Sequence, residues 1–427
     1  MLKKWLSILV VMSIFCLSYV KEGWTAAFEG PGVCVRPLTM GGAFIGLADD
    51  WSAVIWNPAG LTQLEGKGFG FSLDYVPAEA SDSNSIANPL QPNKDQKDVF
   101  VNPGNEIDRF NKQDVKSTVY LPTIAGYTQF RGFVVGGAIY TPLGYASTWE
   151  DTVGTISGKY EIEAYEIVFN ISAAKKEIMP NLSAGLGLNL VWGKLEKSAQ
   201  KVTPGYTYKI DYDGDGSDFE GVFSLFYKYQ PNLNLGFIYR TGSKITFDGS
   251  AKRTHTAIPF LNHSTDYEQV FRHPSTYGFG IAYQPNPKLT LTGDWNRTDW
   301  SKQRDEITYT TQQIEPFVNT NEDLDWKDVD KIRLGAEYTL NELWKLRAGF
   351  FTDPSPMPDK AVSMTNLIDI DRNYYSLGAG YKKDNWQIDM GILHTKDDQV
   401  KKHPATNEEV TYEKKCTSVH IATSCQL

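Results

Sequence analysis

The sequence has few cysteines, no excess of positive charge and, beyond its N-terminus, no long apolar run. Its 427 residues include four cysteines, too few for a fold held together by disulfides. The net charge is −9, which argues against nucleic acid as a partner. Mean hydropathy is −0.37, and no later apolar run reaches the roughly 18 residues that a transmembrane helix needs. The low hydropathy excludes a helical membrane protein, and the chain is long enough for a large single β-domain.

Enzyme signatures are also absent. The chain contains no HExxH, no GxSxG, no phosphate-binding loop and no glycine-rich dinucleotide turn after a strand. His394 and His420 could in principle serve a hydrolase, but the sequence names no serine partner for either. We therefore expect neither enzymatic activity nor a cofactor.

The N-terminus has the pattern of a secretory signal peptide. Lys3 and Lys4 precede an apolar stretch over residues 6–20, and Thr25-Ala26-Ala27 supplies small residues for cleavage. We expect residues 1–27 to be removed. The mature chain would then be periplasmic, secreted or in the outer membrane, where a bridge between Cys416 and Cys425 could form.

Apolar and polar residues alternate through most of the remaining chain, as they do in half-buried strands. The clearest run puts one face on Leu182, Ala184, Leu186, Leu188, Leu190 and Trp192. The same period of two recurs at residues 69–75, 165–173, 233–239, 277–283, 289–291, 332–338, 344–350, 375–381 and 386–392. We count about fourteen strands, an even number as in bacterial outer-membrane barrels.

Periodicity alone does not separate a soluble sandwich from a membrane barrel. The faces opposite the apolar ones carry charges, among them Arg333, Glu337, Arg347 and Asp389. In a barrel these charges would line the lumen, and the apolar faces would meet lipid. Aromatic residues make up 13% of the chain and often begin or end the apolar faces, as in the aromatic girdles of barrels. We therefore favour the barrel.

Two kinds of connection alternate along the chain. Short turns rich in Pro, Asn and Asp are expected at residues 179–181, 230–232, 284–287, 340–342 and 383–385 and would face the periplasm. Long polar loops are expected at residues 77–116, 143–158, 200–218, 249–274, 299–328, 352–372 and 395–409 and would face outward. We expect residues 67–427 to form the barrel.

Residues 37–64 are the most helix-like part of the chain. An apolar stripe at helical spacing is formed by Met40, Ala43, Phe44 and Leu47. A second helical turn should carry Trp51, Val54 and Ile55 and stop near Trp56, because Asn57 precedes Pro58 and a pre-proline residue avoids the helical region. A small apolar piece ahead of many strands suggests a plug, or hatch, over residues 28–66 inside the barrel.

The run GGAFIGLADDWSAVIWNPAGL resembles the N-terminal hatch of the FadL/OmpP1/TodX family of outer-membrane transporters. Later segments also resemble the family's hairpins, including PSTYGFGIAYQPNPKLTLTGDWNRTDWS and DVDKIRLGAEYTLNELWKLRAGFFTDPSPMPD. The match covers about residues 30–395. It implies an outer-membrane protein of a Gram-negative bacterium, inserted by the barrel-assembly machinery. Such a protein would import long-chain fatty acids or similar hydrophobic molecules passively, with surrounding lipid as its other partner.

The resemblance also implies where the gate lies. In the family the hatch blocks the lumen and helps form an inner ligand site, and the ligand leaves sideways through the wall. It assigns a hinge-like gating role to Asn57, Pro58 and Ala59, although Asn57 could instead simply cap a turn. Candidate apolar contacts to the ligand are Phe28, Leu38, Phe44 and Leu47. Arg36 could pair with a carboxylate head group, and the alternative that we favour is a salt bridge to an inward Asp or Glu.

The outer loops contain two weaker candidates. Phe260 and Leu261 make the loop at 249–274 partly apolar, so together with the loop at 200–218 it would offer a first capture site. Asp211, Asp213 and Asp215 are spaced as in a calcium loop, but the glutamate expected at its twelfth position is missing. We interpret the run as a solvated acidic turn and assign no metal site.

The C-terminus departs from the family pattern, because it ends EKKCTSVHIATSCQL rather than in an aromatic strand with a final Phe. Barrel closure is therefore the open question, since an unpaired strand edge in lipid is very costly. Other functions also stay open: an aromatic-hydrocarbon uptake channel, a structural or adhesion barrel, and a secreted β-sandwich lectin.

Overall fold

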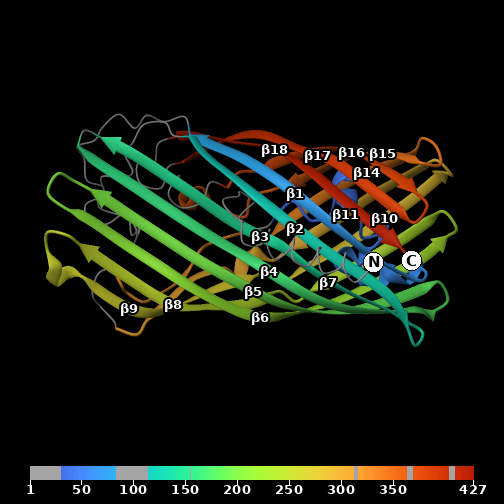
Figure 1. Ribbon diagram of the computed structural model, residues 1–427, viewed down its shortest axis with the longest axis horizontal. Helices are drawn as coiled ribbons and strands as arrows, with labels where there is room; N and C mark the ends of the chain where they lie inside the picture. Colours follow the sequence, from blue (N-terminus) through green and yellow to red (C-terminus); the bar gives the residue numbers. More distant parts are fainter. Residues whose placement is uncertain (1–29, 83–113, 154, 312–315, 363–368, 403–408) are drawn as a thin grey trace.

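The wall of the molecule is a closed antiparallel barrel of fourteen strands (Figure 1). The computed structural model describes residues 30–82, 114–153, 155–311, 316–362, 369–402 and 409–427. The proposed signal peptide at 1–27 and the candidate Phe28 lie outside these residues. The barrel strands are β1 (Lys67–Asp82), β2 (Asp114–Phe130), β3 (Phe133–Val153), β4 (Ile156–Met179), β5 (Leu182–Val202), β6 (Thr207–Gln230), β7 (Leu233–Arg240), β10 (Thr276–Asn286), β11 (Leu289–Thr298), β14 (Val329–Thr339), β15 (Trp344–Asp353), β16 (Arg372–Lys383), β17 (Trp386–Lys402) and β18 (Glu409–Gln426).

The alternation in the sequence decides which way each side chain points. Leu186 and Leu188 are 64% and 54% exposed on the outside of β5. The next residue, Asn189, points to the opposite, inner face and is fully buried. Exposed aromatics mark the two edges of the apolar band, with Tyr75 and Tyr120 toward one edge. The other edge carries Phe130, Phe133, Tyr283, Tyr338 and Trp386. The predicted barrel is confirmed.

The atypical C-terminal segment closes the barrel. β18 pairs with β17 on one side and with β1 on the other, from Gly68 opposite Gln426 to Asp82 opposite Tyr412. Period-two alternation is enough for this pairing, and a terminal Phe is not required. Cys416 and Cys425 both lie on β18 and are free thiols, since nine residues of strand hold them about 30 Å apart.

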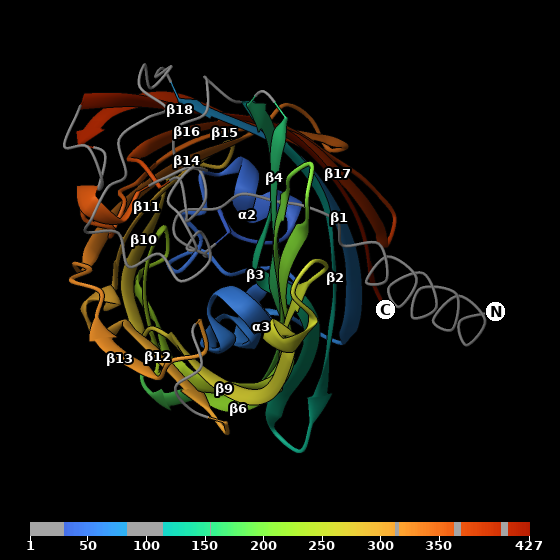
Figure 2. The ribbon, with the colours of Figure 1, turned by 90° about the vertical axis from the view of Figure 1, so that its left-hand side faces the viewer.

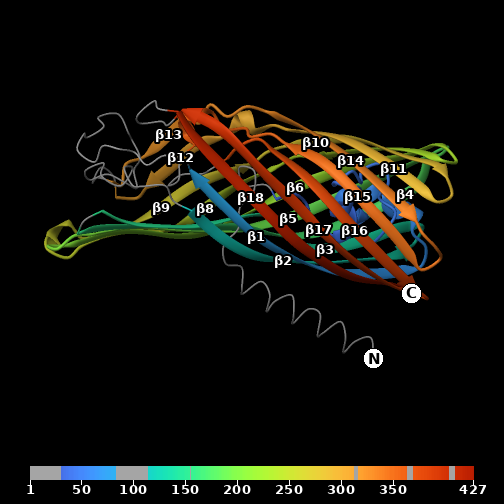
Figure 3. The same ribbon diagram turned by 90° about the horizontal axis from the view of Figure 1, so that it is seen from above.

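Most of the predicted outer loops that the structure describes are wrong, because the sheet continues into them. Residues 83–113, the greater part of the loop predicted at 77–116, lie outside the described residues. Residues 208–215 of β6 pair with β5 and with β8 (Ser243–His255), and β8 pairs with β9 (His263–His273). β9 pairs with β12 (Arg304–Tyr309), which pairs with β13 (Thr320–Asp323). The polar residues at 200–218 and 249–274 therefore alternate in strands. These four strands and residues 208–215 of β6 form an outer collar at the end of the barrel opposite the C-terminus (Figure 3).

Residues 30–66 lie inside the barrel (Figure 2). This segment contains α2 (Val35–Thr39), α3 (Ala53–Trp56) and the 3₁₀ turn η1 (Pro58–Gln63). Short 3₁₀ turns also occur at η3 (Pro259–Leu261), η4 (Trp300–Lys302) and η5 (Asp359–Ala361). Within the described residues, no helix is long and apolar enough to cross a membrane.

One of the two helix predictions for the plug is wrong. The stripe from Met40 to Leu47 is not helical, because Gly41 and Gly42 take φ values of 62° and 69°, which a right-handed helix does not allow. The helix instead precedes them, in α2. The second prediction is confirmed: α3 ends at Trp56, and Asn57 is extended with φ −163°. From here on, residues 30–66 are called the plug.

Candidate functional site

The plug is seated against a belt of glycines on the inner wall. A side chain at any of these positions would collide with plug atoms: Gly70 with Trp51, Gly136 with Val54, Gly185 with Pro58 and Ala59, Gly236 with Ile45, Gly280 with Gly46, Gly335 with Met40, Gly349 with Gly41, and Gly378 and Gly391 with Thr39. These glycines come from nine different strands, so plug and wall touch almost all the way round. The lumen is therefore shaped to receive this segment of backbone.

Asn57 bridges the plug internally and to the wall. Its Nδ2 donates to the carbonyl of Ile45 at 2.8 Å and to that of Leu225, on β6, at 3.1 Å. Its Oδ1 accepts from the Ala59 N–H at 3.1 Å and so caps η1. The residue is fully buried. Asn57 thus caps the turn before Pro58, and it also ties together three segments that are distant in sequence.

Other wall side chains hold the plug by its backbone. The carboxylate of Asp294, on β11, accepts the N–H groups of Phe44 and Ile45 at 2.7 and 2.8 Å. Ser224 Oγ accepts the Ala59 N–H at 2.9 Å, and the guanidinium of Arg240 donates to the Ile55 carbonyl. Buried backbone groups left without a partner are costly, so these contacts fix the plug's position.

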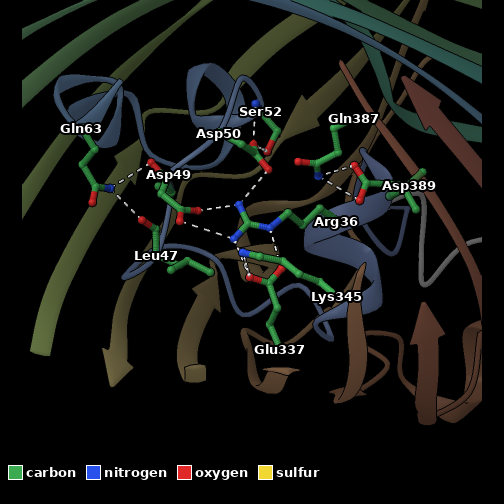
Figure 4. Close-up of polar contacts among 12 residues, drawn as sticks. Arg36, Leu47, Asp49, Asp50, Ser52, Gln63, Glu337, Lys345, Gln387 and Asp389 are labelled. Atoms are coloured by element: carbon green, nitrogen blue, oxygen red, sulfur yellow. Dashed lines mark hydrogen bonds and ion pairs between the residues drawn. The ribbon is translucent and has the colours of Figure 1, made fainter. Parts of the chain in front are cut away.

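An ionic latch at the end of the barrel that holds the C-terminus joins the plug to three strands (Figure 4). Arg36 donates to both oxygens of Glu337, on β14, at 2.9 and 3.1 Å, and it contacts Asp49 and Asp50 at 2.5 and 3.1 Å. Glu337 also binds Lys345 at 2.8 Å and Arg347 at 2.7 Å. Arg347 continues the chain to Asp389, on β17, at 2.6 Å. Arg36 therefore forms the salt bridge favoured by the sequence.

A cavity of about 150 Å³ lies between the plug and the wall. Its apolar lining from the plug is Val33, Ile45, Ile55 and Trp56, and the wall adds Val168 and Ile238. Its polar lining includes Tyr140, Glu220, Arg240, His273, Asn296, Lys331 and Arg333. The cavity is thus apolar on one side and charged on the other.

The apolar residues chosen from sequence do not line this cavity. Leu38, Phe44 and Leu47 are at most 7% exposed and belong to the packed interior of the plug. Phe44 packs edge-on against Trp56 at 6.5 Å and lies under the Arg36 guanidinium. Sequence reasoning missed Glu220 and Arg240, which look like ordinary inward polar residues of a strand. The sequence predicted Trp56 only as the end of a helix and not as part of the cavity lining.

A second cavity of about 310 Å³ lies between the plug and the end of the barrel that holds the C-terminus. It is lined by latch residues including Arg36, Asp49 and Lys345, and by Trp51 and Leu64. The short turns at Asn341 and Asn385 also line it. The latch therefore stands between this space and the interior of the plug.

Beside the first cavity, the neighbouring wall strands β2 and β3 stop pairing with each other, and this break in the sheet is called the parting. β2 and β3 are hydrogen-bonded only from Ile124 opposite Ile139 to Phe130 opposite Phe133. Further out, the described part of β2 pairs with β1 alone and that of β3 with β4 alone. The β3–β4 register shifts between Tyr140 and Leu143, at Pro142, which has no N–H to donate. The Pro142 carbonyl accepts the N–H of Gly30 at 3.0 Å, and Tyr140 and Pro142 both line the cavity.

The outer collar has an aromatic core of its own. Tyr208, Tyr212, Tyr267, Tyr309 and Phe317 are buried together there. The hydroxyls of Tyr212 and Tyr309 are 2.8 Å apart, and burial raises the pKa of Tyr309 to about 12. Burial also lowers the pKa of Lys197, which donates to Gln269 at 2.7 Å, to about 8. The collar is a folded extension of the barrel rather than a set of mobile loops.

The two weaker outer candidates have different outcomes. Phe260 is 85% exposed on η3, at the tip of the β8–β9 hairpin, and Leu261 is beside it. The calcium candidate is wrong, because Asp211, Asp213 and Asp215 lie at alternate positions of β6, where side chains are about 7 Å apart along the strand and cannot converge. Asp211 pairs instead with Lys209 at 2.6 Å. Among the described residues no group of three His, Cys, Asp or Glu could hold a metal.

His420 does have partners that the sequence could not name. Its Nδ1 lies 2.8 Å from Asp74 Oδ1, and its Nε2 lies 2.8 Å from Ser418 Oγ. All three residues are about 1% exposed, and Ser418 also contacts the Leu393 carbonyl at 3.4 Å. Neither cavity described above reaches them. This Ser418–His420–Asp74 series of contacts joins β18 to β1 and reinforces the pairing that closes the barrel.

A closed barrel with an internal plug and a half-apolar cavity beside a parting in its wall defines a class of outer-membrane transport protein. The family model "Outer membrane protein transport protein (OMPP1/FadL/TodX)" matches residues 38–426. The chain belongs to this family, whose members are outer-membrane transporters of hydrophobic compounds in Gram-negative bacteria.

Individual relatives agree with this assignment. The chain is 23% identical to the long-chain fatty acid transport protein of Escherichia coli O157:H7, over 89% of this chain and 90% of that one. A FadL homologue from Pseudomonas aeruginosa superposes with a TM-score of 0.77 at 15% identity, covering 93% of this chain and 99% of that one. The Pseudomonas putida toluene transporter TodX gives 0.68 at 15% identity, with the same coverage.

Proposed function

We propose that this protein imports amphipathic hydrophobic molecules, such as long-chain fatty acids, by passive diffusion. In this proposal the molecule passes the exposed Phe260 tip, enters the cavity between plug and wall, and leaves sideways between β2 and β3. The observation that carries the proposal is that Tyr140 and Pro142, at the point where the wall parts, also line the cavity.

A sideways exit suits the chemistry of such a ligand. An apolar chain gains about 0.8 kcal/mol for each buried CH₂ group, so it is better kept out of water throughout. A route through the second cavity would instead pass charged latch residues such as Arg36, which line that cavity. The parting instead opens toward the apolar band of the membrane, beside the exposed Tyr120.

The gate in this proposal is the start of the plug. Gly30 is held to β3 by a backbone hydrogen bond to Pro142, whereas the plug from Thr39 onward is packed against the glycine belt. Movement of residues 30–33 would open the cavity toward the parting without unseating the rest. Asn57, Pro58 and Ala59 then act as the fixed base of the gate.

A second candidate ligand is a small aromatic hydrocarbon. Its support is the size of the cavity, about 150 Å³, which is small beside the 300 Å³ or more of typical drug-sized sites. The charged half of the lining, with Glu220, Arg240 and His273, favours an amphipathic ligand instead. A pure hydrocarbon would leave those groups desolvated without compensation.

The test is uptake in a strain lacking the native gene and carrying plasmid copies of variants. Ile238→Trp would fill the cavity, because Ile238 lines it and is 6% exposed. Leu235→Trp, on the same strand, faces lipid at 38% exposure and is the matched control. We expect Ile238→Trp to abolish growth on long-chain fatty acid and Leu235→Trp to support it. Equal growth of the two variants would refute the cavity as the route.

A further inference from the structure

Two buried carboxylates beside the plug–wall cavity have oxygens that receive no hydrogen bond from the described residues, although the Oε2 of Glu220 accepts from Asn189 and Arg240. Glu220, on β6, lines the cavity and is 2% exposed, and no described group donates to its Oε1. Glu166, on β4, is 1% exposed, and neither of its oxygens receives a hydrogen bond from the described residues. It lies 3.5 Å from Nδ1 of the cavity-lining His273. The unsatisfied groups on this side are therefore mainly acceptors.

The cations of the same lining are already engaged. Arg240 donates to the Ile55 carbonyl and lies 3.4 Å from the other oxygen of Glu220. Arg333 contacts the carbonyls of Pro31 and Gly41 and lies over the rings of Trp56 and Phe351. Lys331 is paired with Asp353 at 3.0 Å. A carboxylate head group entering this cavity would have to break one of these contacts to find a cation.

We propose that the cavity selects amphiphiles whose head group donates a hydrogen bond and carries no negative charge, such as a hydroxyl or a protonated carboxyl. This inference rests on the proposed function and names the head-group chemistry of its ligand. A donor placed near Glu220 and the His273–Glu166 pair satisfies acceptors that the protein leaves open. An acceptor-only head would leave them unpaired, and an anion would add repulsion.

The energetic reason is the cost of burying an unpaired acceptor. A ligand that enters the cavity excludes water from these carboxylates, and it must then replace the water's hydrogen bonds in kind. Leaving a buried charged acceptor unpaired is expensive enough to change binding about tenfold or more.

A head-group series at constant chain length tests the proposal. 1-Decanol, decyl methyl ether and decane sulfonate would be titrated into the full-length protein in amphipol, below their critical micelle concentrations. We expect 1-decanol to bind about tenfold more tightly than the ether and the sulfonate to bind most weakly. Sulfonate binding as tight as that of decanol would overturn the inference. If none of the three binds, the proposed function itself fails.

Two variants localise the effect. Glu220→Gln and Glu166→Gln keep the side-chain volume but replace a carboxylate oxygen with an NH₂ group. Each should therefore lower, several-fold, the ratio of the affinity for 1-decanol to the affinity for decyl methyl ether. Glu161→Gln is the matched control, because Glu161 is also on β4 but is 45% exposed and pairs with Lys159. A ratio unchanged in both variants would contradict the proposal, and the second variant keeps the test valid if the first does not fold.

Discussion

The guanidinium of Arg36, on the plug, grips both carboxylate oxygens of Glu337, on β14, at 2.9 and 3.1 Å. The two residues are 301 positions apart in the chain, and both are buried. Arg36 is the latch residue that joins Glu337 to Asp49 and Asp50, so the plug and the periplasmic end of the barrel are held as one unit. This pairing makes the latch a testable part of the account.

Removing Arg36 should loosen the plug. In Arg36→Met, Glu337 keeps Lys345 and Arg347, but Asp49 and Asp50 lose their cation. Breaking a buried pair from one side costs about 3–5 kcal/mol, so we expect a lower thermal unfolding midpoint and faster hydrogen exchange over residues 35–50. Arg297→Met, which breaks the exposed pairs to Asp328 and Asp330, should change neither. Unaltered exchange in Arg36→Met would show that the latch does not hold the plug.

The glycine belt predicts a purely steric effect. A methyl group at Gly349 would collide with the backbone nitrogen of Gly41, which cannot move without displacing the plug. We expect Gly349→Ala to expose the plug to limited proteolysis while the barrel still folds. At Gly293 the nearest atoms are 3.6 Å from an added methyl, an ordinary contact, so Gly293→Ala should resist proteolysis like the wild type. Identical digestion of both variants would rule out close seating.

Asn57 and Pro58 should differ in importance, although they are adjacent. Asn57→Ala removes both donors and leaves the carbonyls of Ile45 and Leu225 unpaired, at about 1–3 kcal/mol each. Pro58 has no N–H to lose, so Pro58→Ala should lower the free energy of unfolding by much less than Asn57→Ala does. Thermal unfolding of the two variants measures the difference. Equal destabilisation would return Asn57 to the role of a simple turn cap.

The barrel was predictable because the lipid and the lumen impose opposite demands on alternate residues. Runs such as residues 182–192 therefore showed their strands directly, and turns such as Asp384, with φ 53°, were marked by their residue types. The outer collar was not predictable in this way. Its strands lie beyond the membrane, where polar residues such as Asp211 and Asp213 face water and look like a loop.

The site was only partly predictable, for a related reason. Asn57 and Arg36 stood out because the plug is short and mostly apolar. Glu220, Glu166 and Arg240 sit at inward positions of strands, where any polar residue is acceptable in a wet lumen. Their special feature is shared burial against the plug, which depends on contacts between distant segments. Sequence spacing carries no signal of that kind.

Lys414 should make stability depend on pH. It lies on β18, five residues beyond the one that pairs with Tyr75, and is therefore outside the apolar band. Burial and then the nearby Arg372 lower its pKa to about 7, against the pull of Asp369. Between pH 7 and about 10.4 the unfolded lysine holds a proton that the folded one lacks. Raising the pH in this range therefore reduces the free-energy cost of burying Lys414, and the stability of the fold rises with pH. Below pH 7 both states are charged and the contribution is constant.

Replacing Lys414 isolates that contribution. In Lys414→Met the rise in unfolding midpoint from pH 7 to pH 10 should become smaller than in the wild type. Lys415→Met, at the exposed neighbouring position, should keep the wild-type slope. Parallel curves for the wild type and Lys414→Met would mean that Lys414 is charged in the folded protein across this range.

The most direct test of the account is photo-cross-linking during uptake. Cells would be given a long-chain alcohol with a diazirine in its tail, irradiated, and the protein's labelled peptides identified by mass spectrometry. We predict labels at Ile45, Ile55 and Trp56 in the cavity and at Tyr140 beside the parting of β2 and β3. Labels at Trp51 and Leu64, in the cavity beneath the plug, without labels at Tyr140 would contradict sideways release and show passage straight into the periplasm.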